Sequence, residues 1–175
     1  MKLVKTLIEG AYLIELEKYQ DERGIFARQF CKTELANYGI DFDIKQCNLS
    51  VNYKKGVLRG LHYQKEPFPE AKIVSCFSGK IYDVIVDIRP NSSTYKKWIA
   101  VELSEDNGLM LYIPSGVAHG FQTLQDNTTV FYQLNEYFHQ ECYSGVRWND
   151  PSLDIKWHNC DNLIINERDA NYELL

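Results

Sequence analysis

The sequence predicts an all-β protein, either a sandwich of two sheets or a closed barrel, with a few short helices. Apolar and polar residues alternate with a period of two along much of the chain, and turn signals recur about every ten residues. Many short strands separated by turns are typical of sandwiches and barrels rather than of strands that alternate with helices. No internal repeat, low-complexity tract or linker interrupts the pattern, so we expect one domain spanning residues 1–175.

The clearest alternation lies in residues 81–89, IYDVIVDIR. The even-numbered residues, one tyrosine and three aliphatics, share one face, and the odd-numbered residues, which include Asp83 and Asp87, share the other. This pattern predicts a strand with one drier face. Residues 72–77 precede it across Ser78-Gly79, which predicts a tight hairpin turn between two paired strands.

The same kind of pattern predicts further strands, with turns at EDNG and QDNT. These strands cover residues 46–50, 56–64, 98–104, 109–114, 119–124 and 128–138. Residues 32–39 predict one short helix, with Thr33 as its N-cap and Gly39 ending it. The segment after Trp157 is polar and irregular, so it either frays or folds back over the mouth of a barrel.

Composition and charge argue against several classes of protein. The net charge is −5 with no basic block, so the electrostatic footprint of a nucleic-acid-binding protein is missing. The five cysteines are odd in number and form no C-x-x-C pair, which favours reduced thiols in a cytoplasmic protein. Glu9 and Glu15 interrupt any signal-peptide core, and no apolar run approaches the ~18 residues of a membrane span. We therefore expect a soluble, cytoplasmic protein without a membrane or nucleic-acid partner.

A histidine motif gives a more specific indication. The pattern G-x5-P-x-G-x2-H, from Gly108 to His119, resembles the second sequence motif of the cupin superfamily of β-barrels. Many cupins hold a metal with that histidine and an H-x-H-x3–4-E cluster from their first motif. Here His62 is followed by Tyr63 and Gln64, and no glutamate stands at the required spacing. Two histidines without a carboxylate partner make a poor transition-metal site, so we expect no metal.

Without a metal, His62 and His119 are either core histidines satisfied by hydrogen bonds or members of a polar pocket. Other polar groups near them favour the pocket: Gln46, Asn48 and Ser50 share one strand face, and Arg59 and Lys72 supply cations that suit an anionic ligand.

Strict alternation places Arg59 and His62 on opposite faces of their strand. A β-bulge near Gly60 is therefore required if both side chains are to face one cavity.

Several motifs together resemble the dTDP-4-dehydrorhamnose 3,5-epimerase family. In chain order they are DERGIFARQF, QCNLS, GVLRGLHYQ, KIVSCFSGKIYDVIVDIRPNSSTYKKW, YIPSGVAHGF, FYQLNEYF, GVRWNDPSLDIKW and NERDA, and the resemblance extends over roughly residues 3–171. It implies a cupin-like jelly-roll β-barrel, a homodimer whose active sites share residues, and no metal or organic cofactor. The implied activity is epimerisation at C3 or C5, or both, of a nucleotide-linked 4-keto-6-deoxy sugar in the biosynthesis of surface-polysaccharide sugars.

The resemblance also implies roles for individual residues. His62 is the base, and Asp169 is its partner, which orients the imidazole and favours its protonated form. Tyr132 is the acid that reprotonates carbon from the opposite face, with Tyr137 as the next candidate. Lys72 stabilises the oxygen anion. The substrate-binding set comprises Arg59 for the diphosphate, His119 for orientation or the oxyanion, and, for nucleotide and sugar, Arg23, Phe26, Arg28, Gln46, Asn48, Tyr137 and Arg168, partly across the dimer.

Two positions depart from the family pattern. Arg28 stands where the family usually has an acidic residue near the nucleotide base, and Gln133 follows the proposed acid where lysine is common. An arginine can donate two hydrogen bonds to guanine, so a GDP-linked substrate is an alternative to a dTDP-linked one. A metal-dependent cupin enzyme and a catalytically silent sugar-nucleotide-binding barrel are the competing classes.

Overall fold

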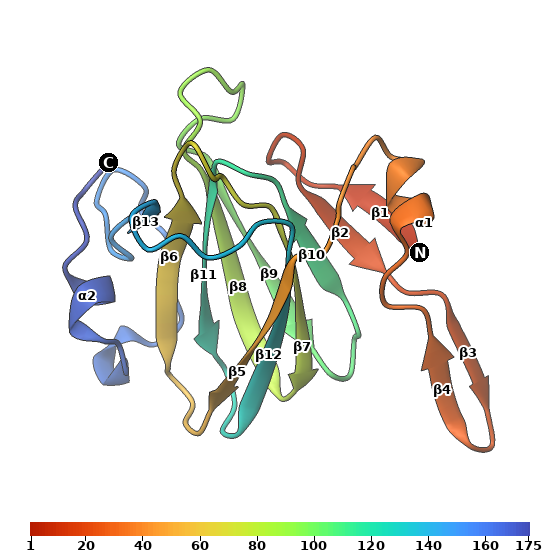
Figure 1. Cartoon of the computed structure of the whole chain (residues 1–175). Coiled ribbons are helices and arrows are strands. Elements are labelled where there is room, and N and C mark those ends of the chain that lie inside the picture. The colour runs from red at the N-terminus through yellow and green to blue at the C-terminus, as the bar shows by residue number, and fades with distance from the viewer.

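The computed structural model describes all residues, 1–175, and most of its strands belong to two antiparallel sheets that face each other (Figure 1). In spatial order, the first sheet contains β1 (Lys2–Lys5), β2 (Tyr12–Glu15), β10 (Met110–Ile113), β7 (Lys72–Ser78), β12 (Thr128–Leu134) and β5 (Gln46–Asn52). The second contains β13 (Tyr143–Gly145), β6 (Leu58–Gln64), β11 (Val117–Thr123), β8 (Lys80–Asp87) and β9 (Trp98–Ser104). This cupin-like jelly roll confirms the all-β prediction.

The chain changes sheet between β7 and β8, and the predicted hairpin at this point is therefore wrong. β7 pairs with β10 and β12, whereas β8 pairs with β11 and β9. Gly79 forms a corner with φ of +74°, and its N–H donates to Glu105 Oε1 at 2.9 Å. A turn signal shows where a strand ends but does not identify the strand with which it pairs.

The main core lies between the two sheets and receives the odd-numbered side chains of β8. Ile81 and Ile85 are fully buried there, and Asp83 lies buried on the same face of the strand. On the opposite face, Val84 and Val86 pack beneath the segment 146–157. The expectation of a single drier face is therefore wrong, because both faces of β8 are covered.

The N-terminal region adds β1, β2 and the helix α1 (Lys32–Ala36), which pack on one end of the first sheet. The helix is shorter than predicted, and its N-cap is Cys31, which makes no side-chain cap hydrogen bond. Thr33 already lies inside the helix, so the predicted cap is wrong. Gly39, with φ of +75°, follows in the turn that leads away from the helix.

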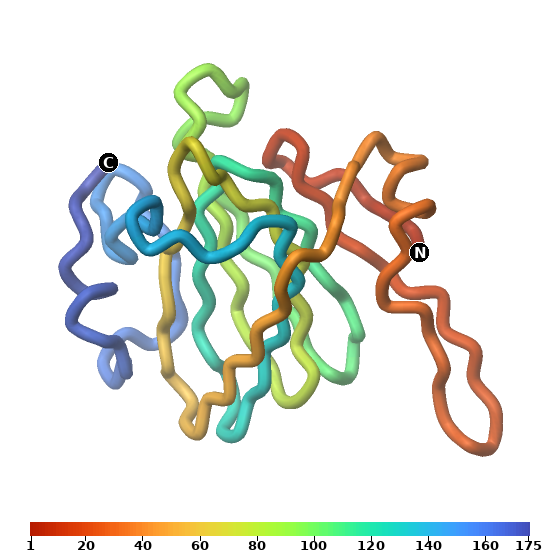
Figure 2. Tube along the Cα trace, in the orientation of Figure 1, coloured from red at the N-terminus to blue at the C-terminus, as the bar shows by residue number.

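A two-stranded hairpin, β3 (Lys18–Asp21) and β4 (Gly24–Ala27), projects away from the two sheets (Figures 1 and 2). Its side chains are almost all exposed, and among them are the large apolar ones of Tyr19, Ile25 and Phe26. Nothing within the chain covers them.

The C-terminal segment folds back onto the second sheet instead of fraying. It contains the short helices η1 (Cys160–Asn162) and α2 (Glu167–Ala170). The backbone N–H of Leu175 donates to Asp150 Oδ2 at 2.6 Å, and Arg147 Nε donates to the carbonyl oxygen of Tyr172 at 2.7 Å. None of the helices has the length and apolar character required to cross a bilayer.

We expect Gly79→Ala to destabilise the protein more than Gly39→Ala. Both substitutions place a Cβ at positive φ, which costs about 1–2 kcal/mol. At Gly79 the new Cβ would also lie 2.5 Å from Thr128 Oγ1, whereas at Gly39 nothing lies within 4 Å. Urea denaturation of both variants should show a further loss of about 1 kcal/mol or more for Gly79→Ala. Equal losses would show that the corner is not tightly packed.

Candidate functional site

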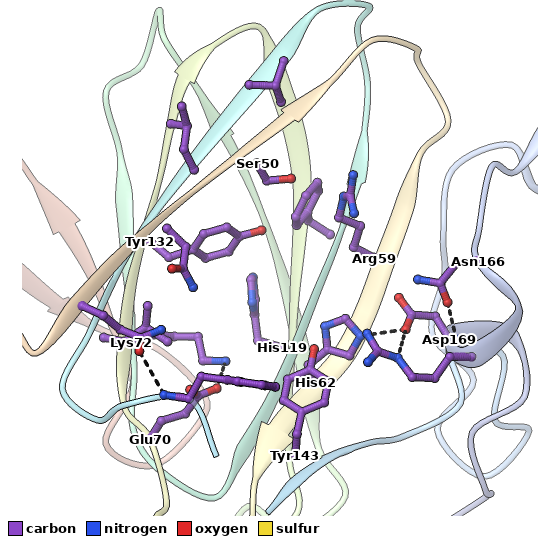
Figure 3. A pocket seen from close by; sticks show the side chains of 18 residues that line it. Ser50, Arg59, His62, Glu70, Lys72, His119, Tyr132, Tyr143, Asn166 and Asp169 are labelled. Carbon is purple, nitrogen blue, oxygen red and sulfur yellow. Dashed lines mark hydrogen bonds and ion pairs between the residues drawn. The ribbon is translucent and has the colours of Figure 1, made fainter. Parts of the chain in front are cut away.

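A pocket of about 490 Å³ lies between the two sheets, and side chains from both sheets and from α2 line it (Figure 3). Seven of its lining residues are hydrophobic and the other eleven are polar or charged. They are Gln46, Asn48, Leu49, Ser50, Val51, Arg59, His62, Glu70, Lys72, His119, Phe121, Tyr132, Leu134, Phe138, Tyr143, Asn166, Arg168 and Asp169.

A bulge in β6 turns Arg59 and His62 into the same pocket, as the sequence required. His119 of β11 pairs with His62 and Phe121 pairs with Arg59, so β6 contains one extra residue between these two pairs. Gly60 occupies this position with φ of +120°, and a Cβ there would lie 2.5 Å from Gly120 Cα. The predicted bulge is therefore confirmed.

His62 forms a buried pair with Asp169. Its Nε2 lies 2.8 Å from Asp169 Oδ1, and the other carboxylate oxygen accepts the backbone N–H of Gly60 at 3.0 Å. The side chain of Asn166 accepts the backbone N–H of Asp169 at 2.7 Å and thereby caps α2. Asp169 is 0% exposed, so this carboxylate is part of the pocket wall rather than a solvated charge.

Burial decides the charge state of this pair. Burial lowers the pKa of His62 below its ordinary value, although hydrogen bonding to Asp169 raises it. Burial alone would raise the pKa of Asp169, but the hydrogen bonds from His62 and Gly60 hold that pKa below its usual range. The pair therefore consists of a neutral imidazole and a carboxylate near neutral pH. Asp169 does favour the protonated imidazole, as expected, but burial is the larger effect and keeps the pKa of His62 below its ordinary value.

A second histidine–carboxylate pair lies deeper in the structure. His119 Nε2 lies 2.7 Å from Asp83 Oδ1, and both side chains are buried. Asp83 Oδ2 has no hydrogen-bond partner within the chain. Asp83 is not among the predicted site residues, although the alternation places it on the same strand face as Ile81 and Ile85.

Lys72 also has a carboxylate partner that the sequence analysis missed. Its Nζ donates to Glu70 Oε1 at 2.6 Å, and the two side chains are 7% and 6% exposed. The acidic residue two positions before a lysine gives no signal in the sequence, because it reads as an ordinary solvated charge.

Two tyrosines line the pocket. Tyr132 extends from β12, and its ring lies 6.1 Å from that of His119. Burial strongly raises the pKa of Tyr132, so its phenol stays protonated. The second is Tyr143, whose ring lies 5.2 Å from that of His62. Tyr137 does not line the pocket and is 56% exposed.

The predicted cations are held by neighbouring groups. Arg59 Nε donates to Asn52 Oδ1 at 2.9 Å, and the guanidinium of Arg168 lies 5.0 Å from the centre of the Tyr143 ring. Gln46, a lining residue from β5, accepts the backbone N–H of Phe138 at 2.9 Å.

Besides Tyr137, three predicted substrate-binding residues lie outside the pocket of their own chain. Arg23 and Phe26 belong to the projecting hairpin, and Phe26 is 73% exposed. Arg28 follows the hairpin and pairs with Glu34, its Nη1 lying 2.7 Å from Glu34 Oε1.

The chain gathers no group of three or more histidine, cysteine, aspartate or glutamate side chains that is suited to a metal ion. Each histidine of the pocket instead directs its Nε2 at a single carboxylate.

Over nearly its whole length the chain is similar to proteins of one family. The family described as dTDP-4-dehydrorhamnose 3,5-epimerase matches residues 5–175. The dTDP-4-dehydrorhamnose 3,5-epimerase of Methanothermobacter thermautotrophicus is 43% identical, over 99% of this chain and 94% of that protein.

Solved structures give the same result. The Bacillus anthracis dTDP-4-dehydrorhamnose 3,5-epimerase with TDP and PPi bound has a TM-score of 0.95 and 39% identity, covering 99% of both chains. A Legionella pneumophila dTDP-6-deoxy-D-glucose-3,5-epimerase in complex with dTDP-4-keto-L-rhamnose has a TM-score of 0.93 and 36% identity, covering 99% of this chain and 92% of the other.

We expect the imidazole of His62 to titrate below the ordinary value of 6.5, because burial lowers its pKa. In Asp169→Asn the midpoint should fall further, because the carboxylate that raises the pKa is lost. Proton-detected NMR of the imidazole Cε1–H, assigned with His62→Gln, measures both midpoints. A wild-type midpoint above 6.5 would show that the carboxylate outweighs burial.

Proposed function

Since the chain belongs to the dTDP-4-dehydrorhamnose 3,5-epimerase family, we propose that its pocket inverts carbon centres of a nucleotide-linked 4-keto-6-deoxy sugar by proton transfer. The chain is a carbohydrate epimerase that acts on nucleotide sugars, as its relatives are.

The reaction requires two proton-transferring groups on opposite faces of the sugar. A ketone at C4 acidifies the hydrogens on C3 and C5, so a base can remove one and leave an enolate. Inversion follows when an acid returns a proton from the other face. His62 extends from the second sheet and Tyr132 from the first, so they enter the pocket from opposite walls (Figure 3). This placement is the observation that carries the proposal.

The protonation states suit these roles. A neutral His62 can accept a proton, and its lowered pKa keeps it neutral near pH 7. Tyr132 keeps its proton because burial raises its pKa. Asp169 holds the imidazole in one orientation and stabilises the imidazolium that forms.

Two further groups can meet the enolate oxygen. The ammonium of Lys72 supplies a positive charge inside the pocket, and a preorganised charge of this kind is often the largest contribution to catalysis. His119 reaches the same cavity from the pocket floor and orients the ring or the oxygen.

The nucleotide is held by the remaining polar groups. Arg59 and Arg168 supply two cations for the diphosphate, and Gln46 and Asn48 contribute hydrogen bonds to nucleotide and sugar.

The carrier is dTDP in this proposal, because the related Legionella enzyme is in complex with a dTDP-linked sugar. A GDP carrier is the alternative, because Arg28 presents a guanidinium near the expected base position. In the free chain that guanidinium is engaged by Glu34, which leaves it less available to guanine.

The active unit in this proposal is a cytoplasmic homodimer. The hairpin β3–β4 extends from the body of its own chain (Figure 1), and Phe26 and Ile25 on it are exposed. Leu49 and Val51 of β5 and Phe77 of β7 are exposed as well. Apolar surfaces of this kind suit contact with a second copy, and Arg23 and Phe26 would then complete the partner's pocket. The cytoplasm is proposed because all five cysteines are free thiols.

We expect the loss of His62 and the loss of Tyr132 to have different signatures in heavy water. His62→Ala should abolish both deuterium exchange and inversion, by roughly 1,000- to 10,000-fold, because the sole base is removed. Tyr132→Phe should still exchange, with retained configuration, because His62 returns the deuteron to the face it left. Asp169→Asn should lie between wild type and His62→Ala.

NMR of dTDP- and GDP-linked 4-keto sugars incubated with each variant measures exchange, product configuration and carrier preference together. It also shows whether C3, C5 or both are exchanged. Normal inversion by Tyr132→Phe would remove Tyr132 as the acid and make Tyr143 the next candidate, since it is the other tyrosine of the pocket.

We expect two inactive variants to restore each other if the hairpin completes the partner's pocket. His62→Ala keeps an intact hairpin, and Phe26→Ala keeps an intact pocket. After subunit exchange in an equal mixture, half of the dimers are mixed and each has one complete site, which gives about a quarter of wild-type activity. If the mixture is no more active than the two variants assayed separately, the hairpin does not complete the pocket of a partner chain.

A further inference from the structure

Glu70 is a buried carboxylate in the pocket to which the proposed mechanism gives no step. Its side chain lines the pocket, and the residue is only 7% exposed. The backbone next to it is fixed, because the N–H of Ala71 donates to Asn135 Oδ1 at 2.6 Å. A charged group this well buried requires a partner, and its partner is Lys72.

Lys72 needs such a partner because of its own side chain. A lysine carries its ammonium on a flexible four-carbon stem, so the charge has no fixed direction unless another group holds it. The backbone of Lys72 is fixed at the start of β7, where it pairs with Ile113 and Leu134. Within the chain the ammonium donates one side-chain hydrogen bond, to Glu70 Oε1 at 2.6 Å. Two of its three N–H groups are therefore left for a ligand.

We propose that Glu70 is a positioning residue that aims the ammonium of Lys72 at the ketone oxygen of the substrate. The inference rests on the proposed role of Lys72 in stabilising the enolate. Glu70 acts as a hydrogen-bond acceptor that holds one N–H of the ammonium and leaves the other two for the substrate. Without Glu70, the side chain of Lys72 is free to adopt other rotamers. The ammonium then points at the ketone oxygen for less of the time, and the developing negative charge is stabilised less.

Two variants of Glu70 distinguish a role as hydrogen-bond acceptor from a role as negative charge. Glu70→Gln keeps the length of the side chain and an oxygen that accepts from Lys72, but it removes the negative charge. Glu70→Ala removes both the acceptor and the charge. If aiming is what matters, the glutamine should recover most of the rate that the alanine loses.

The test measures deuterium exchange and inversion of the dTDP-linked 4-keto sugar by wild type, Glu70→Ala, Glu70→Gln, Lys72→Met and the double variant Glu70→Ala/Lys72→Met. We expect Glu70→Ala to lower kcat by roughly 10- to 100-fold with KM changed by less than about threefold, because the aim matters for the enolate rather than for binding. Glu70→Gln should lie within about threefold of wild type. In the Lys72→Met background, Glu70→Ala should lower kcat by less than a further factor of about two, because Glu70 is proposed to act only through Lys72.

The affinity for dTDP, measured by calorimetry, and the midpoint of thermal unfolding identify a variant that no longer folds. If Glu70→Ala does not fold, the activity of the isosteric Glu70→Gln is compared with that of wild type instead. Wild-type kcat in Glu70→Ala, a glutamine as slow as the alanine, or a full additional loss in the double variant would each overturn the inference. If Lys72→Met is inactive while Glu70→Ala is fully active, only the role of Glu70 fails. If Lys72→Met itself is fully active, the proposed role of Lys72 fails and the inference fails with it.

Discussion

The carboxylate of Asp169 joins parts of the chain that lie far apart in the sequence. One of its oxygens binds His62 and the other accepts the backbone N–H of Gly60. The backbone N–H of Asp169 itself donates to the side chain of Asn166. The carboxylate is fully buried, and a hydrogen bond to a charged group typically contributes about 1.5–3 kcal/mol. The bulge that turns two strand residues into one cavity, the imidazole and the last helix are therefore fixed relative to each other by one side chain.

The two histidine–carboxylate pairs differ in their access to the pocket, and this difference separates their roles. The side chain of His62 is 18% exposed, whereas that of His119 is 5% exposed and its partner Asp83 is completely buried. One oxygen of Asp83 binds His119, and the other has no hydrogen-bond partner within the chain. A group that removes a proton from carbon must reach the substrate, and His62 has the more open position. Under the proposed mechanism, this difference favours His62 as the base and leaves His119 to orient the substrate.

Much of the fold could be predicted from local pattern, but its pairing could not. Alternation located β5 to β12, because it reports local burial, although β12 ends at Leu134 rather than at residue 138. It did not locate the short strands β1 to β4 and β13. The partner of a strand depends on contacts distant in sequence, as at Gly79. The convergence of Arg59 and His62 could be predicted because their spacing contradicted a regular strand and Gly60 allowed a bulge. Glu70 could not, because a carboxylate beside a strand has the same appearance in the sequence whether it is solvated or buried. The role of the C-terminal carboxylate came from the family resemblance alone.

The pocket carries its charges inside a protein interior, and pairing makes this possible. Lys72 with Glu70 and His62 with Asp169 each satisfy part of the hydrogen-bonding capacity of a buried charged group before any ligand arrives, and the exposed Arg59 is held by the buried side chain of Asn52. Each pair leaves donors or acceptors unused, so the same groups can still meet a diphosphate, a ketone oxygen or a proton on carbon. Because their partners already fix their directions, little reorganisation is required when charge develops on the substrate. The network that stabilises these charges in the empty pocket is thus also the network that prepares them for the reaction.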